Sequence, residues 1–351
     1  MKKRLLIINK IQFGQLTDSV KWCEYLKDTY DITFLCVDNG LPRYEMDGIS
    51  FYYVPFVRFL HIGAILFLLA CVVKILFYRG EILIEFFHGC GVLKRIFSRK
   101  KMFLDVRTLS IEKSEKSRNI FDKEISRCAK LYDRISVISE GVKHKLDLSK
   151  ACILPLGSDV ISTTTKQFDG DIRLLYVGTL LNRDIDKTIL GLKLFIDANQ
   201  DKKISYDIIG DGPNNELLEL KKLVRILHLQ QYVIFHGRIP YEKLNIFFNH
   251  CNVGVSFVPI TDYYQYQPPT KTFEYAMSGL YCIATNTLAN QEIINSKCGI
   301  LINDTPEEFC KALFWIVNNS QQIKDTEIRQ QLKRFNWKRI VDCMMIPMLE
   351  K

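Results

Sequence analysis

The sequence predicts an α/β protein made of two Rossmann-like, doubly wound domains that face a cleft. Three observations support this fold class. Short apolar runs alternate with segments of helical spacing, the alternation starts afresh after residue 159, and the 351 residues, 48% of them hydrophobic, suffice for two domains of ordinary size. Because strands that alternate with helices form parallel sheets covered on both faces, we expect one such sheet in each half of the chain.

The first domain, residues 1–158, begins with the run KKRLLIINK, which is short and apolar and therefore predicts a buried strand rather than a helix. Further strands of this kind are expected at 31–38, 49–56, 81–89, 101–107 and 134–140. Helices are expected between them, at 19–30, 62–77, 92–97 and 117–132.

The second domain, residues 159–337, repeats the pattern. Strands are expected at 171–178, 204–212, 232–237, 253–259, 281–285 and 299–303, and helices at 187–199, 215–228, 240–251, 271–278 and 306–318. Residues 338–351 are expected to form a helix that packs back on the first domain. Since ligands of such sheets bind at the carboxyl ends of the strands, we expect the site in the cleft between the two domains.

The apolar run at 62–77 requires a decision about membranes. A spanning helix needs about 20 predominantly apolar residues, and Lys74 interrupts this shorter run. A buried core helix is our first interpretation. A helix that touches a membrane surface is the second, because phenylalanines, arginines and a lysine lie in and around the run.

Charge and cysteine usage limit the class of protein. Residues 1–158 hold 26 Lys and Arg against 17 Asp and Glu, a difference of +9, whereas residues 159–351 hold 22 of each. The basic first half fits either an anionic membrane surface or an ordinary soluble surface. A nucleic-acid partner is not expected, because the second half has no basic excess. The 11 cysteines are scattered singly, which favours reduced thiols in the cytoplasm.

Four loops of the second domain follow strands directly and carry residues suited to an anionic ligand. Glycine lets a backbone approach a ligand closely, and an arginine or lysine beside it can neutralise phosphate. The residues concerned are Gly178, Thr179 and Arg183, then Gly210 and Gly212, then Arg238 and Ile239, and finally the segment 263–274. Taken alone, each loop could equally be a tight turn.

The fourth loop leads into the most informative pair of residues. Lys271 lies at the start of a predicted helix, where backbone N–H groups and the helix dipole also favour a diphosphate. Glu274 follows one turn later on the same face, and its carboxylate can accept hydrogen bonds from both hydroxyls of a ribose. The alternative is an exposed salt bridge between the two side chains.

Several segments together resemble the retaining family-4 (group 1) glycosyltransferases of the GT-B fold. They are LPLGSD, LLYVGTLLNRDIDKTI, YDIIGDGP, VIFHGRIPYEKLNIFFNHCNVGVSFVP, KTFEYAMSGLYCIATN and QEII followed by CGILI, which occur in the family's order over residues 150–302. The first half is similar to the family only in its strand–helix pattern, in FHG and in ISVISEGV. The resemblance implies the transfer of a sugar from a nucleoside diphosphate.

The resemblance also implies roles for single residues. Arg183 and Lys271 would neutralise the donor diphosphate, Glu274 would bind the ribose, and the backbone near Arg238 and Ile239 would meet the base. In the first domain, Gly14 would face the diphosphate or the acceptor, and His88 would lie over the donor sugar. Asp105 and Arg107 would shape the acceptor side. Donor contacts are also expected from Gly178, Thr179, Gly210, Gly212, Tyr266 and Thr270.

The sequence departs from the family at two positions. Tyr266 stands where the family has the first glutamate of a pair, a residue that contacts the transferred sugar. Asp184 stands where a lysine is usual, and the adjacent Arg183 would supply the cation instead. These departures leave the identity of the donor sugar open.

We therefore expect a hexosyltransferase-type enzyme that uses a nucleotide-sugar donor, no metal and no cofactor. Asp169 and Asp171 precede a strand and are interpreted as a turn. The acceptor would be a hydroxyl of a glycan or lipid-linked glycan in cell-surface polysaccharide synthesis, at a cytoplasmic or peripheral membrane location. A nucleotide-sugar epimerase and a non-catalytic nucleotide-sugar-binding subunit are the alternatives.

Overall fold

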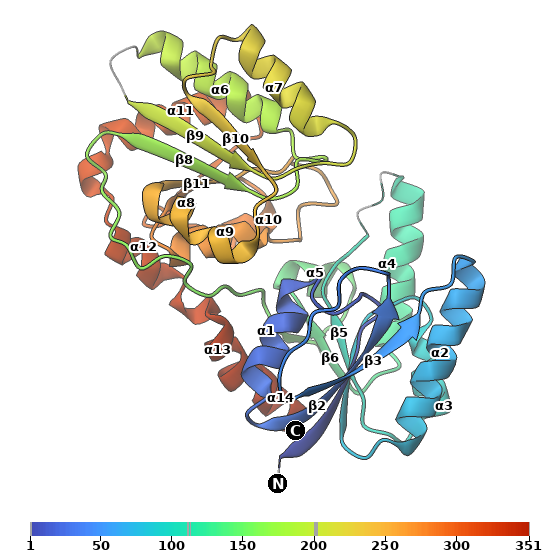
Figure 1. Cartoon of the computed structure of the whole chain (residues 1–351). Helices are drawn as coiled ribbons and strands as arrows, with labels where there is room; N and C mark the ends of the chain where they lie inside the picture. The colour runs from blue at the N-terminus through green and yellow to red at the C-terminus, as the bar shows by residue number, and fades with distance from the viewer. Residues whose placement is uncertain (1, 111, 113, 200–202, 351) are drawn as a thin grey trace. The chain divides into compact units, whose positions relative to one another are not determined.

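The computed structural model describes residues 2–110, 112, 114–199 and 203–350. The chain forms two compact units, which are described separately below (Figure 1). Unit 1 comprises Met1–Leu156 together with Trp337–Lys351, and unit 2 comprises Gly157–Asn336. The polypeptide therefore passes between the units twice, once in each direction.

Unit 1 is built on seven parallel strands in the order β3-β2-β1-β4-β5-β6-β7. The strands are β1 (Lys3–Ile8), β2 (Tyr30–Asp38), β3 (Ile49–Pro55), β4 (Glu81–Glu85), β5 (Phe103–Val106), β6 (Arg134–Val137) and β7 (Cys152–Ile153). The helices are α1 (Thr17–Leu26), α2 (Leu60–Phe77), α3 (Cys90–Ile96), α4 (Glu115–Ala129) and α5 (Glu140–Lys145). In Figure 1, α2 and α3 lie on the opposite side of this sheet from α1.

The last segment of the chain completes unit 1. It consists of α13 (Trp337–Ile340), a π-helical turn (Val341–Met345) and α14 (Ile346–Glu350), and it packs on α1. Trp337 is 1% exposed and Val341 is fully buried, while Lys3 forms an ion pair with Glu350 at 2.7 Å. Apolar burial is the main stabilising term here, because a surface ion pair contributes little.

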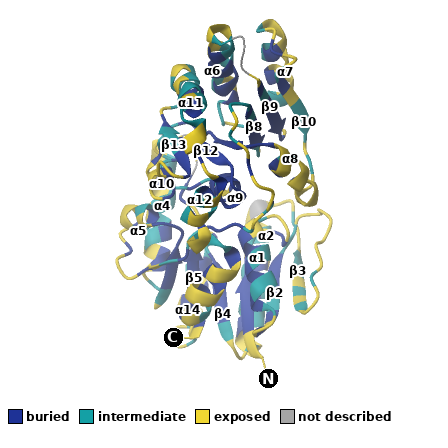
Figure 2. Cartoon of the chain, turned by 90° about the vertical axis from the view of Figure 1, so that its left-hand side faces the viewer, coloured by how far each residue is buried: buried dark blue, intermediate teal, exposed yellow. Residues whose placement is uncertain are grey.

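Unit 2 is built on six parallel strands in the order β10-β9-β8-β11-β12-β13. The strands are β8 (Ile172–Val177), β9 (Ile204–Ile209), β10 (Val233–Gly237), β11 (Val253–Ser256), β12 (Tyr281–Thr285) and β13 (Gly299–Ile302). The main helices are α6 (Ile185–Ala198), α7 (Glu216–Ile226), α8 (Asn245–His250), α9 (Thr270–Met277), α10 (Leu288–Gln291), α11 (Pro306–Asn318) and α12 (Asp325–Gln331). Strands β8, β9 and β12 are mostly buried (Figure 2), as expected for a sheet covered on both faces.

The predicted fold class is confirmed, since both sheets are parallel and doubly wound. Element boundaries differ by a few residues, and the helix predicted at 240–251 is divided into a 3₁₀ turn (Tyr241–Lys243) and α8. The first interpretation of the apolar helix is wrong for one of its faces: α2 buries Phe67, Cys71 and Ile75 but leaves the opposite face exposed. Among the described residues, no helix combines the length and apolar character needed to cross a membrane.

Candidate functional site

A pocket of about 590 Å³ opens at the carboxyl ends of three neighbouring strands of unit 2. It is lined by Val177, Gly178, Thr179, Ile209, Gly210, Asp211, Gly212, Pro213, Arg238 and Ile239. The parallel register aligns the strand ends, because Val177 of β8 pairs with Ile209 of β9 and Ile209 pairs with Gly237 of β10. Six residues that the sequence predicts as donor contacts therefore meet in one pocket.

Backbone hydrogen bonds extend the sheet into the loops of the pocket. The amide of Gly178 donates to the carbonyl of Ile209 at 3.0 Å, and the amide of Gly210 donates to the carbonyl of Gly237 at 2.8 Å. Only glycine fits at position 210, where φ is +150° and a Cβ atom would lie 1.8 Å from the carbonyl oxygen of Gly178. The pocket floor is thus backbone that a ligand can approach closely.

Lys271 lies beside this floor, near the N-terminus of α9. Its Nζ atom is 3.8 Å from the centre of the Tyr176 ring, and it is 3.0 Å from the position that a Cβ atom at Gly178 would occupy. The residue is 8% exposed and has no hydrogen bond or ion pair among the described residues. Burial lowers the pKa of Lys271 well below its ordinary value, the Arg183 guanidinium lowers it further, and Glu274 opposes the shift.

Glu274 follows Lys271 by one turn of α9, as the sequence predicts. Burial raises the pKa of Glu274 from 4.5 to about 7, and Lys271 partly offsets the shift. The two groups do not form a direct ion pair in the described structure, so the exposed salt bridge considered above is not formed. A buried lysine and a buried carboxylate one turn apart have few interactions with water. The charged and hydroxyl groups of a ligand can supply the interactions that they lack.

Arg183 is placed by Tyr264, a residue of the loop that precedes α9. Its guanidinium lies 4.8 Å from the centre of the Tyr264 ring and donates a hydrogen bond to the Tyr264 hydroxyl. The neighbouring Asp184 instead forms an ion pair with Lys187 at 3.0 Å. Arg183 is close enough to Lys271 to affect its pKa, so two cations converge on this part of unit 2. Sequence reasoning missed the contacts of Tyr176 with Lys271 and of Tyr264 with Arg183, because both are long-range.

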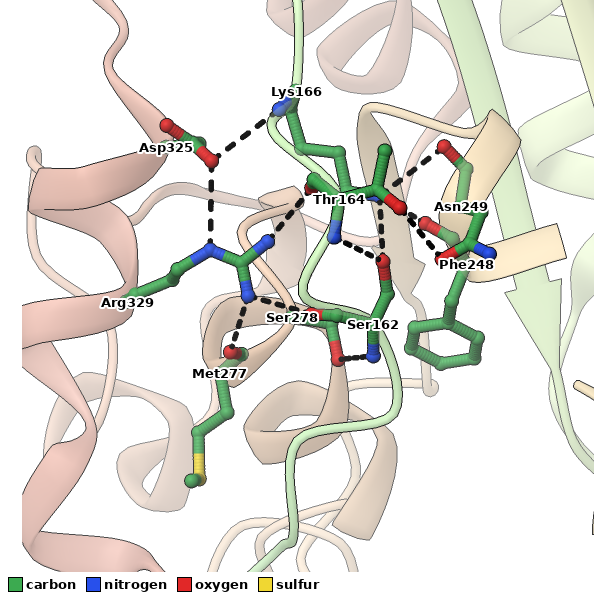
Figure 3. A network of polar contacts seen from close by, with 9 residues as sticks. All are labelled: Ser162, Thr164, Lys166, Phe248, Asn249, Met277, Ser278, Asp325 and Arg329. Carbon is green, nitrogen blue, oxygen red and sulfur yellow. Dashed lines mark hydrogen bonds and ion pairs between the residues drawn. The ribbon is translucent and has the colours of Figure 1, made fainter. Parts of the chain in front are cut away.

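Hydrogen bonds hold α9 in place at the pocket and behind its C-terminus. At the pocket side, the Tyr275 hydroxyl accepts a hydrogen bond from the Val177 amide at 2.8 Å, which ties α9 to the end of β8. At the far end, Arg329 of α12 donates to the carbonyl oxygens of Met277 at 3.1 Å and Ser162 at 2.6 Å (Figure 3). The Ser278 hydroxyl also accepts from the amides of the 161–162 segment. Sequence reasoning missed this network, since Arg329 is distant in the chain.

The remaining donor-side residues of unit 2 lie in and after the loop that leads to α9. Tyr266 is half-buried in this loop, and Thr270 is exposed as the first residue of α9. The α9 N-terminus has no side-chain cap, because its N-cap residue is Pro269. Of its first amides, that of Thr272 donates to the Pro269 carbonyl at 3.1 Å, and no side chain caps the others.

Two of the predicted residues of unit 1 lie in loops after strands. Gly14 follows β1 with a φ of +96°, and a Cβ atom there would lie 2.8 Å from Cβ of Tyr44. His88 follows β4, has a side chain 55% exposed, and pairs through Nδ1 with Glu124 at 2.8 Å. Phe121 packs edge-on against its ring. His88 is thus an oriented, accessible imidazole.

The other two predicted residues of unit 1 belong to a buried cluster. Asp105 is fully buried and accepts a hydrogen bond from Ser136, while Arg107 donates to Asp18 at 2.8 Å. Glu85 completes the cluster, and burial followed by repulsion from Asp18 raises its pKa to about 8. In this structure Asp105 has no exposed surface with which to touch an acceptor. Sequence reasoning missed Asp18 and Glu85, since nothing local marks them as partners of Arg107.

The described residues contain no group of three or more histidine, cysteine, aspartate or glutamate side chains placed to hold a metal ion. The cations and backbone N–H groups near the pocket instead suit a ligand that brings its own negative charge. A pocket of about 590 Å³ is within the range of small-molecule sites.

Comparisons with known proteins found a matching family model and similar folds. Residues 171–319 match the family model for Glycosyl transferases group 1. The sucrose-phosphate synthase structure from Thermosynechococcus elongatus is similar over 99% of both chains, with a TM-score of 0.78 and 16% identity. The apo lipopolysaccharide outer core galactosyltransferase WaaB has a TM-score of 0.72 and 16% identity, again over 99% of both chains.

A third similar structure is HepE from Anabaena in complex with UDP-glucose, with a TM-score of 0.72 and 12% identity over 99% of this chain and 100% of that chain. Identities this low show the fold. A search of curated proteins found no match. Most of unit 2 thus matches the Glycosyl transferases group 1 model, and the whole chain has the two-domain GT-B fold of these glycosyltransferase structures.

Proposed function

We propose that this protein transfers a sugar from a nucleoside diphosphate sugar to a hydroxyl group of an acceptor. One observation carries the proposal: Lys271 is buried without a hydrogen bond or ion pair, at a helix N-terminus beside a glycine-floored pocket. A buried cation without an anion is costly unless a ligand supplies the anion. A diphosphate provides that charge and also suits the α9 N-terminus, which has no side-chain cap.

In this proposal the residues of unit 2 act on the leaving group. As the bond to the anomeric carbon breaks, negative charge builds on the diphosphate, and Lys271 and Arg183 stabilise it because they are already in place. Glu274 accepts hydrogen bonds from the ribose hydroxyls, and the backbone at Arg238 and Ile239 contacts the base. The low solvation of Lys271 strengthens its attraction to the diphosphate.

The finer assignments follow the family resemblance. We propose that a hexosyl group is transferred with retention at the anomeric carbon, without a metal or cofactor. His88 is the unit 1 residue that we assign to the donor sugar, because its ring is exposed and held by Glu124. The acceptor that we propose is a glycan or lipid-linked glycan of a cell-surface polysaccharide, used by a cytoplasmic enzyme at a membrane surface.

Binding and turnover test the proposal separately. Isothermal titration calorimetry with UDP, GDP and ADP should show micromolar binding of at least one of the three. UDP is tested first, because HepE was solved with UDP-glucose. Incubation of the best nucleotide's hexose derivatives with a mixture of membrane glycolipids and oligosaccharides should release the nucleoside diphosphate, with EDTA present or absent. If none of the three nucleotides binds, the proposal is wrong.

A non-catalytic subunit is the one competing function with an observation in its favour, since Tyr266 replaces a glutamate expected near the transferred sugar. Such a protein would bind the nucleotide but would show neither transfer nor slow hydrolysis of the donor. Proton NMR of the donor during a long incubation distinguishes the two, and it also detects epimerisation.

A further inference from the structure

The exposed face of α2 is the most unusual surface of unit 1. Ile65, Leu69 and Val73 are 57%, 54% and 58% exposed, and Phe77 at the end of the helix is 79% exposed. The opposite face is fully used by the core, where Phe67, Cys71 and Ile75 are at most 1% exposed. The helix is therefore apolar on both sides but buried on one.

The exposed residues form one continuous stripe. At about 100° per residue, positions 62, 65, 66, 69, 73, 76 and 77 fall within an arc of roughly 120°. A helix that is apolar all round is normally buried all round, and a large apolar patch left in water marks an interaction site. The stripe is long as well as wide, because α2 has 18 residues.

The neighbouring helix α3 widens the stripe. It packs beside α2 (Figure 1) and exposes Val92 and Ile96. We define the α2–α3 surface as the exposed apolar side chains of the two helices, namely Ile62, Ile65, Leu66, Leu69, Val73, Leu76, Phe77, Val92 and Ile96. These nine apolar side chains exceed the single exposed apolar residues that are scattered over an ordinary surface.

The two segments that carry the α2–α3 surface hold charged side chains of one sign. The segments 48–80 and 86–104 contain no aspartate or glutamate, but they contain eight lysines and arginines. Three of the eight have structural roles. Lys74 lies 3.3 Å from the centre of the Tyr52 ring, Lys94 is buried and pairs with Asp133 at 3.1 Å, and Lys100 donates to the Tyr78 carbonyl at 2.9 Å near the end of α2. The exposed Arg58, Arg79, Arg95, Arg99 and Lys101 have no ion pair among the described residues.

We propose that the α2–α3 surface docks on an anionic lipid bilayer, with α2 lying in the interface rather than crossing it. An apolar stripe flanked by unpaired cations is the pattern of helices that insert one face into lipid and attract acidic headgroups. A second copy of the chain fits less well, because a symmetric contact through this surface would bring the two acid-free basic segments together. The bilayer supplies both the apolar medium and the missing negative charge.

The α2–α3 surface begins close to the predicted acceptor residues of unit 1. Strand β3 ends at Pro55 and α2 begins at Leu60, so the start of α2 lies at the carboxyl edge of the unit 1 sheet, where Gly14 and His88 also lie. This step rests on the proposed function: an acceptor hydroxyl borne by a lipid would be held at the edge where His88 is exposed. The docking itself does not require it.

Vesicle flotation of the full chain tests the proposal. The protein should float with vesicles of equimolar phosphatidylcholine and phosphatidylglycerol at low salt, and binding should fall steeply with added salt. Leu69→Glu with Val73→Glu should weaken binding at least about tenfold, because the charged side chains would have to enter the interface. Arg95→Gln with Arg99→Gln and Lys101→Gln should weaken it by roughly a hundredfold on anionic vesicles.

Matched variants in unit 2 provide the controls. Leu218→Glu with Ile226→Glu changes two exposed apolar residues of α7, and Lys221→Gln with Arg225→Gln and Lys297→Gln removes three exposed charges. These should float like the parent protein. Circular dichroism should show that all variants are folded, as expected for exposed positions.

Three outcomes would overturn the proposal. The parent protein could fail to float at low salt, the α2–α3 variants could float as well as the parent, or light scattering without lipid could reveal a dimer that Leu69→Glu with Val73→Glu abolishes. Nucleotide binding by the same variants in the absence of vesicles is measured in parallel. If the parent protein does not bind a nucleotide, the proposed function is refuted. The vesicle result remains valid in that case, because docking does not depend on nucleotide binding.

Discussion

Replacing Gly210 by alanine perturbs the pocket floor at its tightest point. The Cβ atom of an alanine would lie 1.8 Å from the carbonyl oxygen of Gly178, and both atoms belong to backbone that is hydrogen-bonded into the sheet. The φ of +150° adds strain that only glycine avoids. The conformation costs about 1–3 kcal/mol and the forced shift of packed backbone about 1–3 kcal/mol more.

Gly210→Ala should therefore reduce the free energy of unfolding of unit 2 by roughly 2–6 kcal/mol. Hydrogen exchange followed by mass spectrometry measures this locally, through faster exchange of amides in β8 and β9, and avoids treating two units as one transition. Titration with the best-binding nucleotide should show at least about a tenfold loss of affinity, because the two loops would move apart.

Two other glycines of the same pocket edge serve as controls. A Cβ atom at Gly212 would meet the Glu216 carboxylate at 2.3 Å, which can turn away only by giving up its hydrogen bond from the Asn214 amide, so Gly212→Ala should cost about 1–2 kcal/mol. At Gly237 nothing lies within 4 Å, and only the φ of +67° is unfavourable, so Gly237→Ala should cost about 1–2 kcal/mol. The reasoning fails if Gly210→Ala is no more damaging than Gly212→Ala.

Three further predictions concern α9. Lys271→Met should weaken nucleotide binding by roughly tenfold to a hundredfold, because a charge-assisted hydrogen bond is lost, without lowering the thermal stability of the free protein; Lys221→Met on α7 is the control, and equal affinities by titration calorimetry would contradict the site. Burial raises the pKa of Glu274 from 4.5 to about 7. Between these two pH values the folded protein keeps the Glu274 proton, whereas the unfolded chain has released it. The contribution of Glu274 to stability is therefore present below about pH 4.5 and lost as the pH rises through about 7. Glu274→Gln should accordingly stabilise the protein by about 1–3 kcal/mol at about pH 8 and by little near pH 4, and urea unfolding at both values measures it. Arg329→Lys should cost about 1–3 kcal/mol and reduce nucleotide affinity, because an ammonium cannot serve three carbonyl oxygens and Asp325 at once; unchanged melting and binding would show that α9 does not depend on this network.

The glycine-lined pocket could be predicted from sequence because its residues follow strands directly. In a parallel sheet, neighbouring strands end at one edge, so Gly178, Gly210 and Arg238 had to come together once the strands were identified. The helical spacing of Lys271 and Glu274 likewise placed both at the start of α9. These inferences need only local pattern and a rule of topology.

What the sequence could not supply is tertiary pairing. Arg107 was predicted on the acceptor side from its place after a strand, but its partner Asp18 lies 89 residues earlier in the chain. The partner of Arg183 is Tyr264, 81 residues later. Both faces of α2 are apolar in the sequence. Periodicity alone therefore could not show that only one face enters the core, or which face it is.

The discontinuous composition of unit 1 constrains how the protein can be made. Its first 156 residues emerge early, yet Trp337, Val341 and the rest of the segment that packs on α1 are synthesised only after the whole of unit 2. Until then the surface of α1 that receives them must stay exposed to solvent or be shielded by a chaperone. Unit 2, encoded without interruption, can mature first during translation, so expression trials of separate pieces should succeed more readily with residues 157–336 than with residues 1–156.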